Sequence, residues 1–197
     1  VCGWGNNELE WYTSRTNNAY VTGGALHIRA QIENTNGYHY TSARLKTQGL
    51  YSKTRGWIEF RAKLPQGTGF WPALWMLGNN IDLVSWPACG EIDIMEQKGQ
   101  ESSKNYGTLH WGPNTAGHQF KGGNVYSIIW KTDTIQFLVD NAQYFEVPFS
   151  QVNGVNPFTL DHFFIFNIAV GGNFLGNPDN TTVLPQRMAV DYIRIYQ

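Results

Sequence analysis

Three carboxylates lie within six residues of the chain, in the stretch "CGEIDIMEQ" at residues 89–97. The acids are Glu91, Asp93 and Glu96, and the residues between them are apolar. Isoleucine-rich runs favour β-strands, and side chains on a strand alternate between its two faces. Glu91 and Asp93 are therefore expected to point the same way, whereas Glu96 would fall on the opposite face of a regular strand.

A β-bulge in this strand would return Glu96 to the face of the other two acids. One extra residue, at Ile94 or Met95, lets two residues oppose one on the neighbouring strand, so that the side chains beyond it change face. Two carboxyl groups about 5–5.5 Å apart suit a retaining glycosidase, in which one is the nucleophile and the other the acid/base. Asp93 between them would then hydrogen-bond a neighbour and help to separate the two glutamate pKa values.

Two other interpretations of these acids stay open at this point. The acids would line a solvated face if the strand had no bulge, with Glu96 on the other side. They would alternatively bind Ca²⁺ or Mg²⁺ through their oxygen atoms.

The composition places limits on the class of protein. A chain of 197 residues fits a single domain spanning residues 1–197. The net charge of −1 provides no electrostatic attraction to nucleic acid or to anionic lipid, and no apolar run approaches the ~20 residues of a membrane span. We therefore expect neither nucleic acid nor a membrane as a partner. Two cysteines, Cys2 and Cys89, would pair in an oxidising compartment or both stay free, and their spacing does not decide between these states.

Period-two patterns of apolar residues dominate the chain and indicate strands. The pattern is clear in residues 23–33, 56–65, 134–147, 162–170 and 188–197. The segment 134–147 is expected to form a hairpin with its turn near Asp140 and Asn141, and 162–170 is apolar enough to be buried on both faces. No segment predicts a helix of three turns. Many short strands separated by turn signals favour an antiparallel sandwich.

Several segments together resemble glycoside hydrolase family 16, in its laminarinase-like branch. They are, in chain order, "GWGNNELEWYT", "YTSARL", "GFWPALWML", "WPACGEIDIME", "AVGGNFLGNPD" and "VDYIRIYQ". In that branch an extra bulge residue is present, and Met95 matches it. The resemblance implies a β-jelly-roll sandwich of two antiparallel sheets with a concave substrate cleft. It also implies endo-hydrolysis of β-1,3-glucan with retention of configuration, without a cofactor for the chemistry.

The resemblance also implies roles for individual residues. Glu91 matches the nucleophile, Glu96 the acid/base and Asp93 the supporting acid. His110, in "GTLHW", matches a histidine close to the acid/base on the neighbouring strand. The competing interpretation of His110 is a strand histidine whose nitrogen atoms are satisfied by a neighbour.

Sugar rings stack their C–H faces on aromatic rings, which must then be exposed in a cleft rather than buried in the core. Trp71 and Trp75 are four residues apart and share a face of a regular strand. The expected substrate contacts are Trp71, Trp75, Trp86, Trp111, Asn7 and Arg44. The competing interpretations are core packing for the tryptophans, a turn for Asn7 and a surface ion pair for Arg44.

A structural calcium ion follows from the same resemblance. Relatives hold this ion with a carboxylate from a segment before the "GNNEL" loop, a backbone carbonyl near a glycine and an aspartate on the last strand. Gly24 and Asp191 match two of these positions. The sequence starts at Val1, just before that loop, so either it is a fragment or the family's N-terminal strand is missing. Without the ligand from that segment we expect calcium affinity to be reduced.

Taken together, the sequence predicts a secreted, monomeric endo-β-1,3-glucanase that acts on β-glucan polysaccharides or oligosaccharides. One alternative is a mixed-linkage β-1,3-1,4-glucanase. Another is a β-glucan-binding module that does not cut its ligand, although such modules typically lose the catalytic glutamates. A third is a structural sandwich stabilised by a metal.

Overall fold

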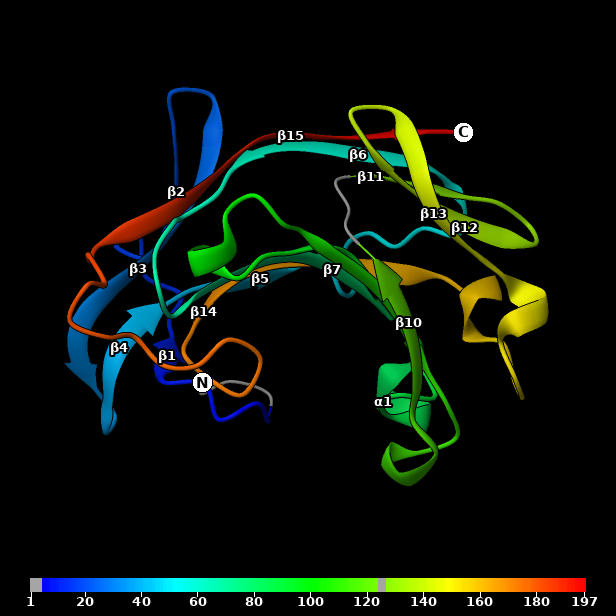
Figure 1. Cartoon of the computed structure of the whole chain (residues 1–197), viewed down its shortest axis with the longest axis horizontal. Helices are drawn as coiled ribbons and strands as arrows, with labels where there is room; N and C mark the ends of the chain where they lie inside the picture. The colour runs from blue at the N-terminus through cyan, green and yellow to red at the C-terminus, as the bar shows by residue number, and fades with distance from the viewer. Residues whose placement is uncertain (1–4, 124–126) are drawn as a thin grey trace.

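The computed structural model describes residues 5–123 and 127–197. Its two sheets are curved in the same sense and lie one over the other, so that the six-stranded sheet forms the inner side of an arch (Figure 1). In the described residues 51% are in strands, which confirms the predicted all-β sandwich. Described helical segments are short: α1 (Ile81–Val84) and the 3-10 turns Gly99–Glu101, Thr115–Gly117, Phe149–Gln151 and Pro157–Thr159.

The outer sheet contains nine strands. Along the sheet they are β1 (Glu10–Tyr12), β4 (Tyr38–Ser42), β3 (Ala25–Thr35), β15 (Gln186–Tyr196), β6 (Gly56–Lys63), β11 (Ser127–Trp130), β12 (Thr134–Val139) and β13 (Ala142–Pro148), with β2 (Ala19–Thr22) paired to β3. The described pairs are antiparallel except β1 with β4, which run parallel, a local exception to the expected antiparallel sheets.

The inner sheet contains six strands and forms the concave side of the arch. In order they are β10 (Gln119–Gly123), β9 (Tyr106–Trp111), β8 (Glu91–Glu96), β7 (Phe70–Gly78), β14 (His162–Val170) and β5 (Arg44–Lys46). The strand that carries the three acids therefore lies near the middle of the sheet, between β7 and β9. Two neighbouring strands fix its backbone, so the side chains of β8 have well-defined directions.

The main core lies between the two sheets and follows from the alternation of side chains along each strand. Ile28 of β3 and Ile58 of β6 on the outer sheet belong to the same buried cluster as Leu74 of β7 and Ile92 of β8 on the inner sheet. The other face of β7 contributes Ala73, Trp75 and Leu77 to a second, smaller cluster. The inner sheet thus has one face in the core and one face on the hollow side of the arch.

Two local predictions are confirmed by the structure. Every residue of β14 is buried, as expected from its apolar pattern on both faces. The chain between β12 and β13 turns at Asp140 and Asn141, whose φ angles are 47° and 65°. Two successive positive φ angles are typical of the tight hairpin turns that match the twist of antiparallel strands.

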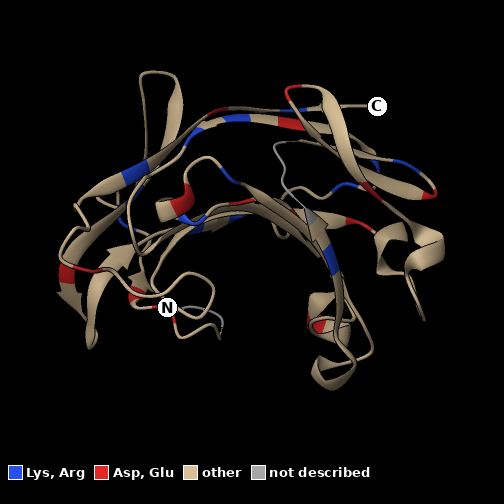
Figure 2. Ribbon diagram, in the orientation of Figure 1, with Lys and Arg blue, Asp and Glu red and all other residues tan. Residues whose placement is uncertain are grey.

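The surface and the cysteines bear on partners. Lys and Arg are interspersed with Asp and Glu, without a continuous stripe of one sign in the view of Figure 2. Within the described ranges, no helix has the length and apolar character needed to cross a bilayer. Cys89 is buried, and Cys2 lies outside the described residues, so the structure does not test whether the two pair.

Candidate active site

A cavity of about 920 Å³ lies on the hollow side of the inner sheet. Alternation on β7 explains its floor, because every second residue faces away from the main core. Residues from all six strands of the inner sheet and from the loops around them line it. The polar and aromatic side chains of the lining include Glu8, Arg44, Trp71, Trp75, Trp86, Glu91, Asp93, Glu96, His110 and Phe174.

The predicted bulge is present in β8 and brings the three acids together. On β7, Leu74 pairs with Met95 and Trp75 pairs with Asp93, so Ile94 has no partner on that strand. Both Ile94 and Met95 turn into the core, and Glu96 returns to the cavity beside the other acids. The bulge is confirmed: Ile94 is skipped on the β7 side, and on the β9 side both Ile94 and Met95 lie between the paired residues Asp93 and Glu96.

Gly90 fixes the point at which the chain enters β8. Its φ angle is +81°, in the region that favours glycine. A Cβ atom at this position would lie 2.8 Å from Pro157 Cβ and 3.0 Å from His162 Nε2. The glycine of the "CGEIDIME" stretch therefore allows the backbone to pass Pro157 closely and sets the direction of Glu91.

Two tryptophans hold the two glutamates in position. Trp86 Nε1 donates a hydrogen bond to Glu91 Oε2 at 2.8 Å, and Trp71 Nε1 donates one to Glu96 Oε1 at 2.9 Å. Each indole leaves the other oxygen of its carboxyl group free of that bond. Both tryptophans therefore position acids, in addition to offering ring faces to the cavity.

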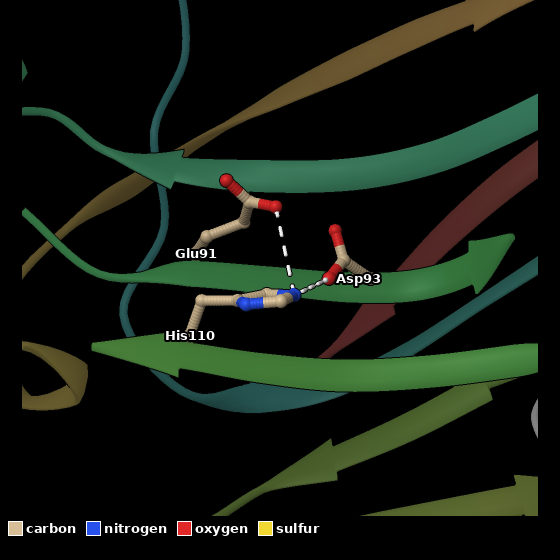
Figure 3. Close-up of side chains that lie close together, drawn as sticks. All are labelled: Glu91, Asp93 and His110. Atoms are coloured by element: carbon tan, nitrogen blue, oxygen red, sulfur yellow. Dashed lines mark ion pairs between the residues drawn. The ribbon is translucent and has the colours of Figure 1, made fainter. Parts of the chain in front are cut away.

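His110 reaches from β9 toward the acids of β8, as Figure 3 shows. Its Nε2 atom lies 3.0 Å from Asp93 Oδ2 and 3.9 Å from Glu91 Oε1. The register explains this position, because His110 is directly opposite Glu91 on the adjacent strand. His110 is thus placed to put positive charge between two carboxyl groups.

Burial is the largest cause of unusual proton affinities in this site. It raises the pKa of Glu91 to about 8, with Asp93 as the next cause, and the pKa of Glu96 to about 7, with Glu91 as the next cause. The pKa of Asp93 is also raised, by burial and then by Glu96. Crowded carboxyl groups cannot all ionise, so the site retains protons near neutrality.

A double displacement needs the opposite order of the two glutamates, with Glu91 ionised and Glu96 protonated. The charge of His110 and the indole N–H of Trp86 both lower the pKa of Glu91. Because these three carboxyl groups titrate together, their protons belong to the group rather than to single residues. A positive charge on His110 therefore favours the ionised form of Glu91.

Arg44 and Trp75 form a second part of the cavity lining. The Arg44 guanidinium lies over the Trp75 ring, 5.7 Å from its centroid, and Arg44 Nη2 lies 3.4 Å from Glu8 Oε2. Trp75 Nε1 donates to Asn167 Oδ1 at 2.8 Å. Arg44 does form an ion pair, as its competing interpretation required, but the pair is buried at the cavity rather than on the surface.

Two predicted sugar contacts do not line the cavity. Trp111 is 3% exposed and belongs to the core between the sheets, because it follows His110 on a strand and so points to the opposite face. The predicted role of Trp111 in sugar binding is therefore wrong. Asn7 is exposed with a φ angle of 55°, and its amide donates to Asn173 Oδ1 at 3.1 Å. Asn7 joins two rim loops at a turn instead of facing the cavity.

Several residues of the lining were not predicted from the sequence. Phe174 packs against Trp71 with ring centroids 4.8 Å apart, next to the side of the cavity that holds Glu96. His118 and Phe120 lie on the other side, near Trp86. The signal that could have identified His118 and Phe120 is their alternation in "HQF" beside the strand of His110. Phe174 lies in a loop and has no such periodic signal.

One group of residues in the cavity has the side chains and the spacing that could hold a metal ion. Among the residues described, the one group of His, Cys, Asp and Glu with ligand atoms within 4.8 Å of one another is Glu91, Asp93 and His110. We assign this group to acid–base chemistry because His110 Nε2 lies 3.0 Å from Asp93 Oδ2, within ion-pair distance.

The two residues matched to a calcium site lie apart from the cavity. Asp191 Oδ2 is 3.1 Å from Arg61 Nη1, and both side chains are exposed. Gly24 lies in the turn between β2 and β3 with a φ angle of +79°. One carboxylate shared with an arginine and one carbonyl do not provide the six to eight oxygen ligands that Ca²⁺ takes. Calcium binding stays a prediction.

Comparison with protein families gives one match over most of the chain. The model of the XgeA-like catalytic GH16 domain matches residues 8–133. The chain is 38% identical over 224 residues to glucan endo-1,3-beta-glucosidase A1 of Niallia circulans, covering 99% of this chain and 33% of that protein. It is 39% identical over 218 residues to a beta-glucanase of Rhodothermus marinus, covering 99% and 76%.

The solved structures similar to this one include bacterial laminarinases. The laminarinase catalytic domain of Thermotoga maritima superposes with a TM-score of 0.90 at 42% identity, covering 99% of this chain and 85% of that one. These likenesses confirm the predicted jelly-roll sandwich. The chain spans only about a third of the Niallia protein, so the activity of a whole protein does not follow from that match.

Proposed function

Because this chain belongs to glycoside hydrolase family 16, we propose that it hydrolyses internal β-1,3-glucosidic bonds of laminarin-like glucans with retention of configuration. The observation that carries the proposal is the pair of glutamates on one wall of the cavity, each bound by a tryptophan indole. The names of the similar endo-1,3-β-glucanases support the choice of linkage.

The residues of the cavity can perform both steps of a double displacement. Glu91 attacks the anomeric carbon and forms a glucosyl-enzyme, while Glu96 protonates the departing glycosidic oxygen. Glu96, now a carboxylate, then removes a proton from the water that attacks the same carbon and releases Glu91. Asp93 and His110 do not bond to the sugar in this scheme; they set the charge beside Glu91.

A panel of glucans tests the linkage and the mode of cleavage. We expect laminarin and curdlan to give a series of oligosaccharides early in the digest, with slower cleavage of lichenan and none of agarose. Chromatographic sizing of the products measures this. Glucose as the sole early product would contradict internal cleavage, and a preference for lichenan would favour the mixed-linkage alternative. Binding of laminarin without any hydrolysis would favour a glucan-binding module.

The indole of Trp71 provides a prediction about pH. Its hydrogen bond lowers the pKa of Glu96, so Trp71→Phe should raise that pKa and keep the acid protonated to higher pH. The alkaline limb of the kcat/KM profile on laminarin is expected to move upward by about half a pH unit or more. An unchanged limb, or a limb that moved to lower pH, would contradict the assigned bond. Trp57→Phe, on the outer sheet strand β6, is the matched control.

Three further features belong to the proposal and await measurement. A soluble polymer does not cross a membrane unaided, so we place the enzyme outside the cell. We also expect a monomer, which light scattering tests. A difference in Tm between protein in Ca²⁺ and protein in chelator would support the calcium prediction, and identical values would contradict it.

A further inference from the structure

His118 is the residue of the cavity whose contacts the proposed chemistry leaves unexplained. It lies just before β10, and Phe120 of that strand pairs with His110 of β9. Because alternate residues share a face, His118 and Phe120 both face the cavity, whose lining includes them. Lys121, between Phe120 and Gly122, points to the opposite face, where it bonds to Gln151.

The side chain of His118 contacts His110, which lies within ion-pair distance of two acids, and Trp86, which donates a hydrogen bond to Glu91. Its Nε2 atom lies 2.8 Å from His110 Nδ1, and the two rings are stacked at 18° with centroids 5.0 Å apart. Its ring also packs on Trp86, with centroids 4.6 Å apart. The nitrogen of His110 that is not near His118 faces Asp93 and Glu91. Asp93, His110 and His118 therefore form a continuous chain of polar contacts.

A hydrogen bond between two ring nitrogens contains one proton, so one ring must donate and the other must accept. If His118 accepts, His110 has a proton on Nδ1 and can also have one on Nε2, facing Asp93, as an imidazolium. If His118 donates, His110 must accept at Nδ1 and cannot be an imidazolium. The state of His118 thus decides how much positive charge His110 can present to the acids.

We propose that His118 is a positioning residue that accepts a hydrogen bond from His110 Nδ1–H and thereby keeps His110 charged beside Asp93 and Glu91. This inference rests on the proposed function of the same site. Burial and the charge of His110 lower the pKa of His118, in agreement with a neutral acceptor ring. Among the described residues, the acids that interact with His110 are Glu91, Asp93 and Glu96, all on β8. The titratable or charged groups from other elements that line the same cavity are Glu8, Arg44 and Tyr106.

Two substitutions separate the hydrogen bond from the ring packing. His118→Gln retains an acceptor oxygen near the position of Nε2 but loses the aromatic ring. His118→Phe retains a ring against Trp86 but has no acceptor. His39→Gln is the matched control, since His39 lies on β4 of the outer sheet and its ring bonds to Asn34.

The expected result is a loss of activity in His118→Phe alone. Without the acceptor, His110 loses charge, the pKa of Glu91 rises, and the acidic limb of the kcat/KM profile moves to higher pH. We expect kcat/KM near neutrality to fall by roughly tenfold in His118→Phe, mainly in kcat, and to stay within about threefold of the wild type in His118→Gln. The control should match the wild type.

NMR of the histidine ring N–H groups detects the same hydrogen bond without substrate. The Nδ1–H proton of His110 should give a strongly downfield signal in the wild type and in His118→Gln, and that signal should be lost in His118→Phe. An unchanged His110 Nδ1–H signal in His118→Phe, or equal impairment of both variants, would overturn the inference. If the wild type hydrolyses no glucan, the proposed function fails, whereas the NMR signal still decides the role of His118.

Discussion

Glu91→Ala is expected to lower kcat/KM on laminarin by roughly 10⁴-fold or more, because the variant lacks the group that forms the covalent intermediate. The side chain lies on the cavity wall, where Trp86 and His110 orient it. Its removal leaves space for a small anion on the same side of the sugar. Steady-state kinetics measure the loss, and Glu146→Ala, at an exposed position of β13, is the matched control.

Azide sharpens this test, because it can occupy the space that Glu91 leaves. With an aryl β-laminaribioside as substrate, azide should restore cleavage by Glu91→Ala and give the α-glycosyl azide. That product has the inverted configuration because only one displacement takes place. Hydrolysis within tenfold of the wild type in the absence of azide would show that another residue is the nucleophile.

Glu96→Ala should have the second-largest effect, and its size should depend on the leaving group. We expect laminarin hydrolysis to fall by about 10²–10⁴-fold, because a sugar alkoxide needs a proton in order to leave. A dinitrophenyl glycoside does not need that proton, so formation of its glucosyl-enzyme should be nearly as fast as in the wild type. Pre-steady-state release of dinitrophenol measures this step.

The second step of the reaction distinguishes Glu96 from a merely structural acid. In Glu96→Ala water lacks its general base, so the glucosyl-enzyme should accumulate. Azide needs no general base and should release it as the β-glycosyl azide, with overall retention. An α-azide from this variant, or an equal loss on both types of substrate, would contradict the assignment of Glu96.

The position of the acids could be predicted because their spacing does not fit the alternation of a regular strand. Glu96 is out of step with Glu91 and Asp93, and a bulge is the local change that places all three on one face. The structure contains this bulge at Ile94 and Met95. Trp71 and Trp75 were predicted to share a face because they are four residues apart on one strand, and both line the cavity.

The errors and omissions have physical causes too. Trp111 was assigned to the cleft because it flanks a segment that matches the family, but it follows His110 on β9, and neighbours on a strand face opposite ways. Phe174 and Asn7 lie on loops, whose positions depend on contacts with distant segments such as the Asn7–Asn173 bond. Asn167 is a polar residue within the apolar strand β14. Its bond to Trp75 depends on the pairing of β7 with β14, which the sequence pattern does not specify.

A nucleophilic Glu91 requires that the bond is cleaved through two displacements, and the configuration of the first product tests this most directly. Proton NMR of a laminari-oligosaccharide digest, recorded within minutes of mixing, follows the new anomeric signal before mutarotation. We predict that the β-anomer appears first and the α-anomer grows in later. Initial appearance of the α-anomer would mean a single displacement, and would contradict the assignment of Glu91 as nucleophile.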